Sequence, residues 1–279
     1  MKKNVFFMGM LVMVLVFGLV FITCSTDSDD DDDNGDPISV DLSLPRIEDV
    51  PSFSGTFVSN ETDAKNLVQA AFEEIGGISP VQSEMNSVRS ISRSVYSEPY
   101  EEIFDHDTTV LSGAEVTGFV QGKETMSAAD DENAGESVGD YMEMSMRIKL
   151  AVDFQDITKN DSIIKGKYSV DEDMYLKAQI TTINPPKGDL TISCDVSDGY
   201  AISISKNNKG LKFVMRLQGK VDKKMTGQST SILDNLDIGN LFETYKLSLD
   251  VYDNANVKQE KYSKTFTSYA EAATYLGIN

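Results

Sequence analysis

Tryptophan is absent from this chain, prolines number only seven, and basic side chains are scarce. The lack of tryptophan removes the commonest stacking platform for sugars. The 25 lysines and arginines are outnumbered by 45 aspartates and glutamates, which gives a net charge of −20 over 279 residues. A chain this acidic is a poor candidate for binding nucleic acid or anionic lipid headgroups. The low proline content and an ordinary content of aromatic residues predict a folded protein.

The first 24 residues have the features of an export signal. Two lysines precede a nearly unbroken apolar run of 18 residues from Val5 to Ile22, which stops at a threonine and Cys24. A basic start, an apolar segment and a small residue at the end are typical of such signals. The segment Phe21-Ile22-Thr23-Cys24 resembles the relaxed lipoprotein signals of spirochaetes, and this resemblance implies a signal peptide over residues 1–23 and lipidation of Cys24. An uncleaved membrane anchor is the alternative, because the run is just long enough to cross a bilayer.

Both interpretations predict a protein that is exported and held at a membrane. Ser25 stands at the second mature position, where an aspartate retains lipoproteins at the inner membrane of enteric bacteria. We therefore expect a lipid anchor in the cell envelope, with the outer membrane favoured and the periplasmic or surface face left open.

Residues 24–44 are expected to form a flexible acidic tether, because a dense run of aspartates repels itself and stays solvated. The spacing of a calcium loop is present within it, with Gly at the sixth position. Pro37 follows closely and no helices flank the segment, so loose condensation of cations is the favoured interpretation. The residues that match the spacing are Asp30, Asp32, Asn34, Gly35 and Asp41.

Neither a metal site nor a catalytic centre is predicted, because the chain lacks the necessary side chains. His106 is the only histidine, and Cys194 is the only thiol left once Cys24 is acylated. A zinc site usually needs three or four nitrogen or sulfur ligands. The acidic segment 101–107 around His106 is interpreted as a solvated loop, and Cys194 as a core side chain. We expect no cofactor and no enzymatic activity; whether acidic loops bind calcium is left open.

Helical spacing occurs near the start of the mature domain, which is expected to span residues 45–279. Apolar residues from Ala64 to Ile75 recur at intervals of three and four, with Asn60 as a cap and Gly76-Gly77 as the end. A weaker helical pattern from residue 79 extends the helical segment to about residue 98, although a serine-rich loop is the alternative there. A short C-terminal helix is predicted to open with the capping box of Ser268 and Glu271 and to close at Gly277.

From Val110 onward the apolar residues alternate, which predicts strands. The clearest stretch runs from Met142 to Phe154, and similar alternation surrounds Cys194, Phe213 and Leu249. Short turns are predicted at 184–188, 197–199 and 207–210. A glycine followed by lysine recurs inside three strands, which either marks bends of a strongly curved sheet or is a coincidence. Those glycines are Gly122, Gly166 and Gly219.

Together these patterns predict a mainly-β fold: a curved antiparallel meander, half-barrel or barrel-like, of about 8–10 strands with one or two packed helices. The architecture resembles the half-barrels that carry lipids or lipoproteins across the periplasm. This resemblance implies a non-enzymatic carrier that holds an apolar ligand on a concave sheet face, since methionine is flexible and suits varied apolar ligands. The alternative is a surface interaction, adhesin or assembly protein with a filled core. The sequence does not identify its protein partner. The ligand-binding candidates are Met142, Met144, Met146, Ile148, Phe213 and Met215.

Overall fold

The computed structural model describes residues 42–76, 95–108, 113–127, 138–183, 186–229 and 240–277. Within these ranges the chain forms nine strands, two α-helices and a short 3-10 helix. In chain order the elements are η1 (Ile47–Asp49), β1 (Thr56–Phe57), α2 (Glu61–Gly76), β2 (Val95–Asp107), β3 (Ala114–Ser127), β4 (Tyr141–Lys159), β5 (Ser162–Ile183), β6 (Pro186–Lys206), β7 (Lys209–Ser229), β8 (Phe242–Tyr252), β9 (Lys264–Phe266) and α3 (Tyr269–Leu276).

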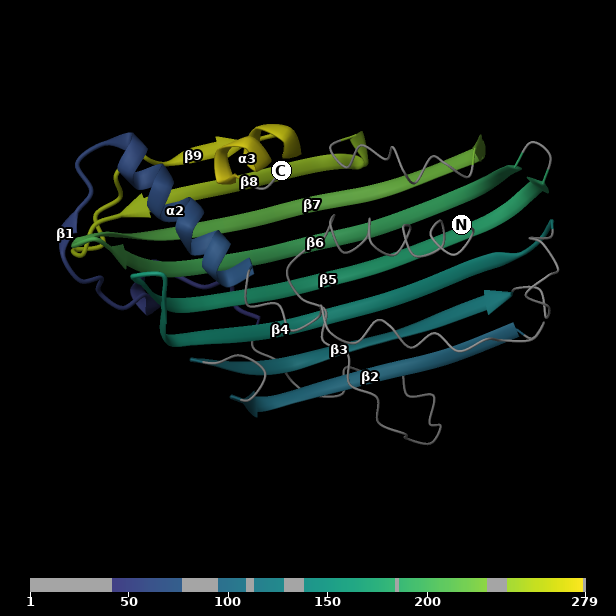
Figure 1. Cartoon of the computed structure of the whole chain (residues 1–279), viewed down its shortest axis with the longest axis horizontal. Helices are drawn as coiled ribbons and strands as arrows, with labels where there is room; N and C mark the ends of the chain where they lie inside the picture. The colour runs from purple at the N-terminus through teal and green to yellow at the C-terminus, as the bar shows by residue number, and fades with distance from the viewer. Residues whose placement is uncertain are drawn as a thin grey trace.

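All nine strands belong to one sheet (Figure 1). Strands β2 to β9 follow one another in sequence order and pair antiparallel, while β1 adds to β7 in parallel. The outer strands β2 and β9 do not pair with each other, so the sheet is open. This arrangement confirms the expected mainly-β meander, its number of strands and its one or two helices.

The four central strands are much longer than usual strands. Strands β4 to β7 contain 19 to 22 residues, whereas five or six is typical. Their side chains alternate between the two faces, and the register aligns the apolar positions of neighbouring strands on one of them. We call this the apolar face. It carries most of the core, including Leu150, Ile164, Ile202 and Leu249.

Both helices pack on the apolar face and cover only one end of it. In Figure 1, α2 crosses β5, β6 and β7 near their left ends, and α3 lies beside β8 and β9. The Asn60 side chain accepts a 2.9 Å hydrogen bond from the Asp63 backbone N–H and so caps α2, as predicted. Ser268 caps α3 through the Glu271 backbone N–H, and Gly277 ends it in the left-handed conformation.

Two glycines in strand interiors have backbone angles that favour glycine. Gly118 in β3 has φ of 143° and Gly166 in β5 has φ of 133°. A Cβ atom at Gly166 would overlap the carbonyl oxygen of Ala201 on β6. The adjacent β4–β5 register also shifts just beyond the Phe154–Gly166 pair. Of the three glycines in the recurring pattern, Gly166 and Gly219 therefore border irregular pairing, while Gly122 lies in regular register.

The structure corrects three local predictions. The helical segment does not extend to residue 98, because Val95 begins β2, and the segment 101–107 is strand rather than loop. Residues 101–104 and Asp107 pair with β3, and the register shifts between Phe104 and Asp107. The predicted turn at 197–199 lies in the middle of β6, where both neighbouring strands provide pairing partners. The predicted turn at 207–210 is present, with Asn207 and Asn208 at positive φ. The possible helix at 79–94 lies outside the described residues.

Candidate functional site

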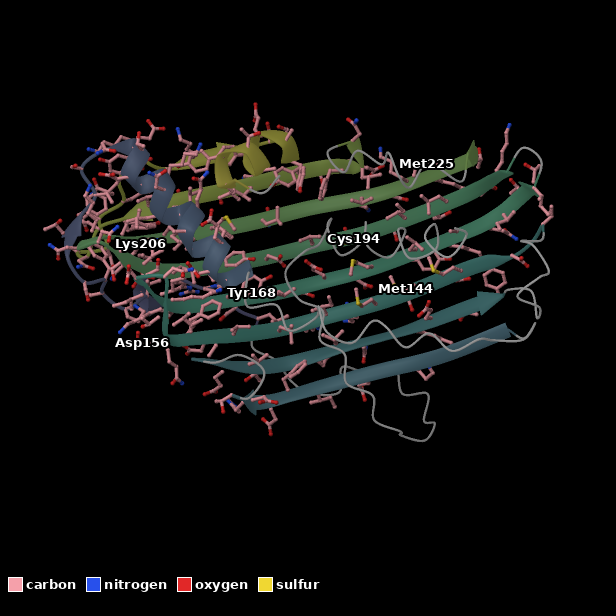
Figure 2. All side chains as sticks on the ribbon, viewed as in Figure 1. Met144, Asp156, Tyr168, Cys194, Lys206 and Met225 are labelled. Atoms are coloured by element: carbon pink, nitrogen blue, oxygen red, sulfur yellow. The ribbon has the colours of Figure 1, made fainter. Side chains whose placement is uncertain are left out.

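The six candidate ligand-binding residues all lie on the apolar face, but the structure divides them into two groups. Met142, Met144 and Met146 follow one another toward the far end of β4, with Ile148 next to them. Met142 and Met144 are half-buried, whereas Met146 and Ile148 are only 3% and 2% exposed. Met144 lies beyond the helices (Figure 2).

Phe213 and Met215 on β7 lie at the helix-covered end instead. The ring of Phe72 from α2 is 6.1 Å from that of Phe213, and Met215 pairs with Tyr200. Tyr200 pairs with Tyr168 on β5, and Tyr168 pairs with Val152 on β4. This row of paired residues therefore crosses β4 ten residues from Met142. At about 3.3 Å per residue along β4, this row lies roughly 30 Å from Met142 and roughly 13 Å from Ile148, the nearest member of the first group. Phe213 and Met215 are thus core side chains beneath α2 and do not adjoin the methionines of β4.

The far end of the apolar face has an unusual concentration of sulfur. We call it the methionine end and define it by Met142, Met144, Met146, Met174, Met225 and Cys194 with the aliphatic residues between them. Met146, Met174 and Cys194 occupy facing positions on β4, β5 and β6. Figure 2 shows Met144, Cys194 and Met225 beyond the end of α2. Burial raises the pKa of the Cys194 thiol, which agrees with a core side chain rather than a nucleophile.

Between the methionine end and the helix-covered end lies a pair of buried acids that the sequence analysis did not single out. Glu172 on β5 and Asp198 on β6 are 6% and 5% exposed. Glu172 faces Ile148 on one side and Val196 on the other, and Asp198 faces Leu217. Both side chains therefore replace an apolar residue in the alternation of the apolar face.

The two carboxyl groups are hydrogen-bonded to each other, and burial dominates their protonation. Loss of hydration raises the pKa of Glu172 well above its ordinary value, and the neighbouring Asp198 charge raises it further. Burial also raises the pKa of Asp198 to about 7, although hydrogen bonds from the Asp171 backbone N–H, Glu172 and Tyr168 act in the opposite direction. The hydrogen bond between them raises the pKa of Glu172 and lowers that of Asp198, so Glu172 is the protonated partner and donates to Asp198.

Two stacked tyrosines adjoin the pair on the side of α2. The rings of Tyr168 and Tyr200 are 4.1 Å apart and nearly parallel, and Phe72 meets Tyr200 edge-on at 5.4 Å. The Tyr168 hydroxyl is within hydrogen-bonding reach of both Asp198 and Tyr200. Burial raises the pKa of both tyrosines, so they remain neutral donors.

One atom of this cluster has no hydrogen-bond partner among the described residues: Oδ1 of Asp198. Leaving a buried acceptor unpaired costs about 1–3 kcal/mol, and more when the group is charged. No ion pair found within the described ranges includes Asp198 or Glu172. The cluster is therefore incomplete as a structural network and has an acceptor available for a donor.

A period-two signal for this pair was present in the sequence. Tyr168, Val170, Glu172, Met174 and Leu176 alternate without a break, which places Glu172 on the apolar face. Two flanking aspartates made the segment resemble one of many solvated acidic stretches. Asp198 was concealed by its neighbours, since Ser-Asp-Gly is a common turn sequence.

The opposite face of the sheet carries a small apolar cluster of Val50, Ala201 and Val214. It also carries a shallow groove of about 670 Å³ with a largely polar lining. Its lining includes side chains of both charges, among them Arg147, Asp173, Asp195 and Lys220. Arg147 and Asp173 form an ion pair at 3.2 Å across β4 and β5. Charged groups here pair with one another along the register, so the groove has no dominant charge.

The remaining candidates give no site in the part of the chain that the structure covers. His106 is exposed and pairs with Glu115 on the neighbouring strand, and no cluster of three or more His, Cys, Asp or Glu suited to a metal ion occurs in the described ranges. Cys24 and the aspartate-rich segment 30–41 lie outside the described residues.

Within the residues that the structure describes, neither helix has the length and apolar character needed to span a bilayer. Comparisons with protein-family models, with curated proteins and with solved structures find no significant match to this chain. The buried acid pair and the methionine end are therefore interpreted from their own geometry and chemistry.

Proposed function

We propose that this protein is a non-enzymatic lipoprotein of the cell envelope that holds an apolar ligand at the methionine end of its sheet. The observation that carries this proposal is the division of the apolar face: the helices cover one end, and the methionine end extends beyond them (Figure 1). The half-buried Met142, Met144 and Met225 form the outer row, where a ligand would enter. Flexible thioether side chains adapt to different apolar shapes.

The proposed location rests on the N-terminal sequence. The apolar run and Cys24 are those of a lipoprotein signal, and anchoring through Cys24 would hold the sheet beside a membrane, the source of apolar ligands. Metabolic labelling with a fatty acid tests the anchor. We expect label in the native chain and none in Cys24→Ala; label that persists in Cys24→Ala would contradict lipidation at this cysteine.

Native mass spectrometry of the full chain extracted from its own membranes tests ligand holding. We expect an excess mass that disappears on denaturation and is identified as a lipid or another apolar molecule. A native mass equal to the denatured mass, together with no uptake of an apolar dye by the delipidated chain, would contradict the proposal.

A second candidate is a surface interaction or assembly protein. Met146, Met174 and Cys194 are only 2–3% exposed, which favours a filled core in the inner rows of the methionine end. The polar groove on the opposite face would then supply the contact surface. Dye uptake separates the two candidates, because a filled core takes up no dye and an accessible apolar face does.

A further inference from the structure

We propose that Asp198, together with Glu172, binds the protonated amine headgroup of an amphiphile whose apolar chain lies along the methionine end. This inference rests on the proposed function, since it specifies the class of apolar ligand. It assigns a role to the one buried polar cluster of the apolar face that the fold leaves incomplete.

The carboxyl of Asp198 needs a further hydrogen-bond donor. Oδ1 of Asp198 is buried and has no partner among the described residues. The other contacts of this carboxyl come from the Asp171 backbone N–H, Glu172 and Tyr168, none of which carries a positive charge. A primary ammonium group supplies three N–H donors and the missing charge. A carboxylate or phosphate headgroup would instead add a negative charge beside two acids, which is unfavourable.

The pairing of β5 with β6 is interrupted around Asp198. The β5–β6 pairs reach Ser169–Gly199 and resume in the same register at Glu172–Val196. Between these pairs, the carboxyl of Asp198 accepts a hydrogen bond from the Asp171 backbone N–H. In a regular antiparallel ladder this N–H would donate to a backbone carbonyl instead. Asp198 is thus held in place by the backbone of the next strand. A carboxylate fixed in this way is preorganised for a ligand and loses little freedom on binding.

Apolar side chains extend along the sheet from the acid pair to the half-buried methionines of the outer row. Glu172 lies in the row of Ile148, and Met142 is six residues farther along β4. The distance is therefore about 20 Å, comparable to an extended acyl chain. The buried side chains of Met146, Met174 and Leu176 lie between these two positions and form the apolar surface against which the chain would pack. A small hydrated cation would lose its hydration here without gaining apolar contact, whereas an amphiphile gains both the charge pairing and the burial of its chain.

Competition for a bound dye tests the headgroup. The full chain in phosphatidylcholine nanodiscs is loaded with neutral N-phenyl-1-naphthylamine, and empty nanodiscs supply the background. Dodecylamine, dodecanol and dodecanoate are then added, since they share one tail and differ in the headgroup. We expect dodecylamine to displace the dye at a concentration lower than dodecanol by on the order of tenfold to a hundredfold, the ratio for one charge-assisted hydrogen bond. Dodecanoate is expected to be the weakest competitor.

The variants Asp198→Asn and Asp195→Asn complete the test. Both remove one carboxylate from β6, but Asp195 is exposed on the polar face. The amine preference should disappear in Asp198→Asn and persist in Asp195→Asn. If dodecylamine and dodecanol compete equally in the native chain, the headgroup inference is overturned and the proposed apolar site stands. If the native chain takes up neither dye nor any of the three amphiphiles, the proposed function is overturned as well. The comparison within the native chain needs no variant to fold.

Discussion

The carboxyl of Asp198 makes the stability of the fold depend on pH. Burial raises its pKa to about 7 in the folded protein from an ordinary value of 3.8. The folded state therefore retains a proton that the unfolded chain releases, so the contribution to stability is greatest below about pH 4 and is lost as the pH rises to about 7. We expect the free energy of unfolding of the native chain to fall relative to that of Asp198→Asn across this window. Urea unfolding at a series of pH values measures the difference.

Asp195→Asn again provides the matched control, because Asp195 is exposed on the same strand. Its curve of unfolding free energy against pH should run parallel to that of the native chain. A difference between the native chain and Asp198→Asn that stays constant from pH 4 to 8, or grows with pH, would contradict a raised pKa at Asp198.

At the scale of elements, the long central strands depend on a glycine that allows β5 to bend. Gly166 has φ of 133°, and any Cβ there would meet the backbone of β6. We expect Gly166→Ala to lower the free energy of unfolding by about 1–3 kcal/mol from backbone strain alone. The clash with Ala201 should add to this. Gly227→Ala is the control, since Gly227 also has positive φ but has open space around it; a loss at Gly166 no larger than at Gly227 would rule out the close approach as the cause.

Phe72 is one of the buried side chains that hold helix α2 on the sheet. Its ring contacts Tyr200 and Phe213 on β6 and β7. We expect Phe72→Ala to lower the free energy of unfolding by about 3–5 kcal/mol, as a large-to-small change in a packed core does. The neighbouring Glu73 is exposed, so Glu73→Ala should change it by only about 0.5 kcal/mol or less. Thermal and urea unfolding of the two variants measure this contrast, and equal losses would mean that the helix is not anchored by this ring.

The elements that could be predicted are those whose local pattern agrees with their surroundings. The alternation from Met142 to Phe154 predicted β4, and the caps at Asn60 and Ser268 predicted the starts of both helices. The predicted turn at 197–199 failed because the local turn preference of Ser-Asp-Gly is weaker than pairing on both sides of β6. Asp198 was missed for the same reason: its burial is produced by neighbours far away in sequence.

For the whole molecule, the apolar face combines two tasks that usually compete. Its helix-covered end, with Phe72, Tyr200 and Phe213, is packed by side chains from three strands and a helix and supplies stability. Its methionine end lies in the same sheet but beyond both helices. Met142, Met144 and Met225 there are only half-buried, so an exchange of these outer side chains affects the fold less. An open meander permits this division, because strands of about 20 residues reach well past the helices that they support.

This division gives the most direct test of the proposed carrier. Met144 on β4 is half-buried on the apolar face, and its neighbour Ser145 is exposed on the polar face. Met144→Lys places a charge where the apolar chain of the ligand would lie, while its aliphatic stem still covers the strand and keeps the fold intact. We expect Met144→Lys to abolish retention of bound lipid and uptake of apolar dye, with its melting temperature close to that of the native chain. Ser145→Lys should retain both, since it adds the same charge to the opposite face. Unchanged retention in a folded Met144→Lys would locate any apolar ligand elsewhere and leave the methionine end as core alone.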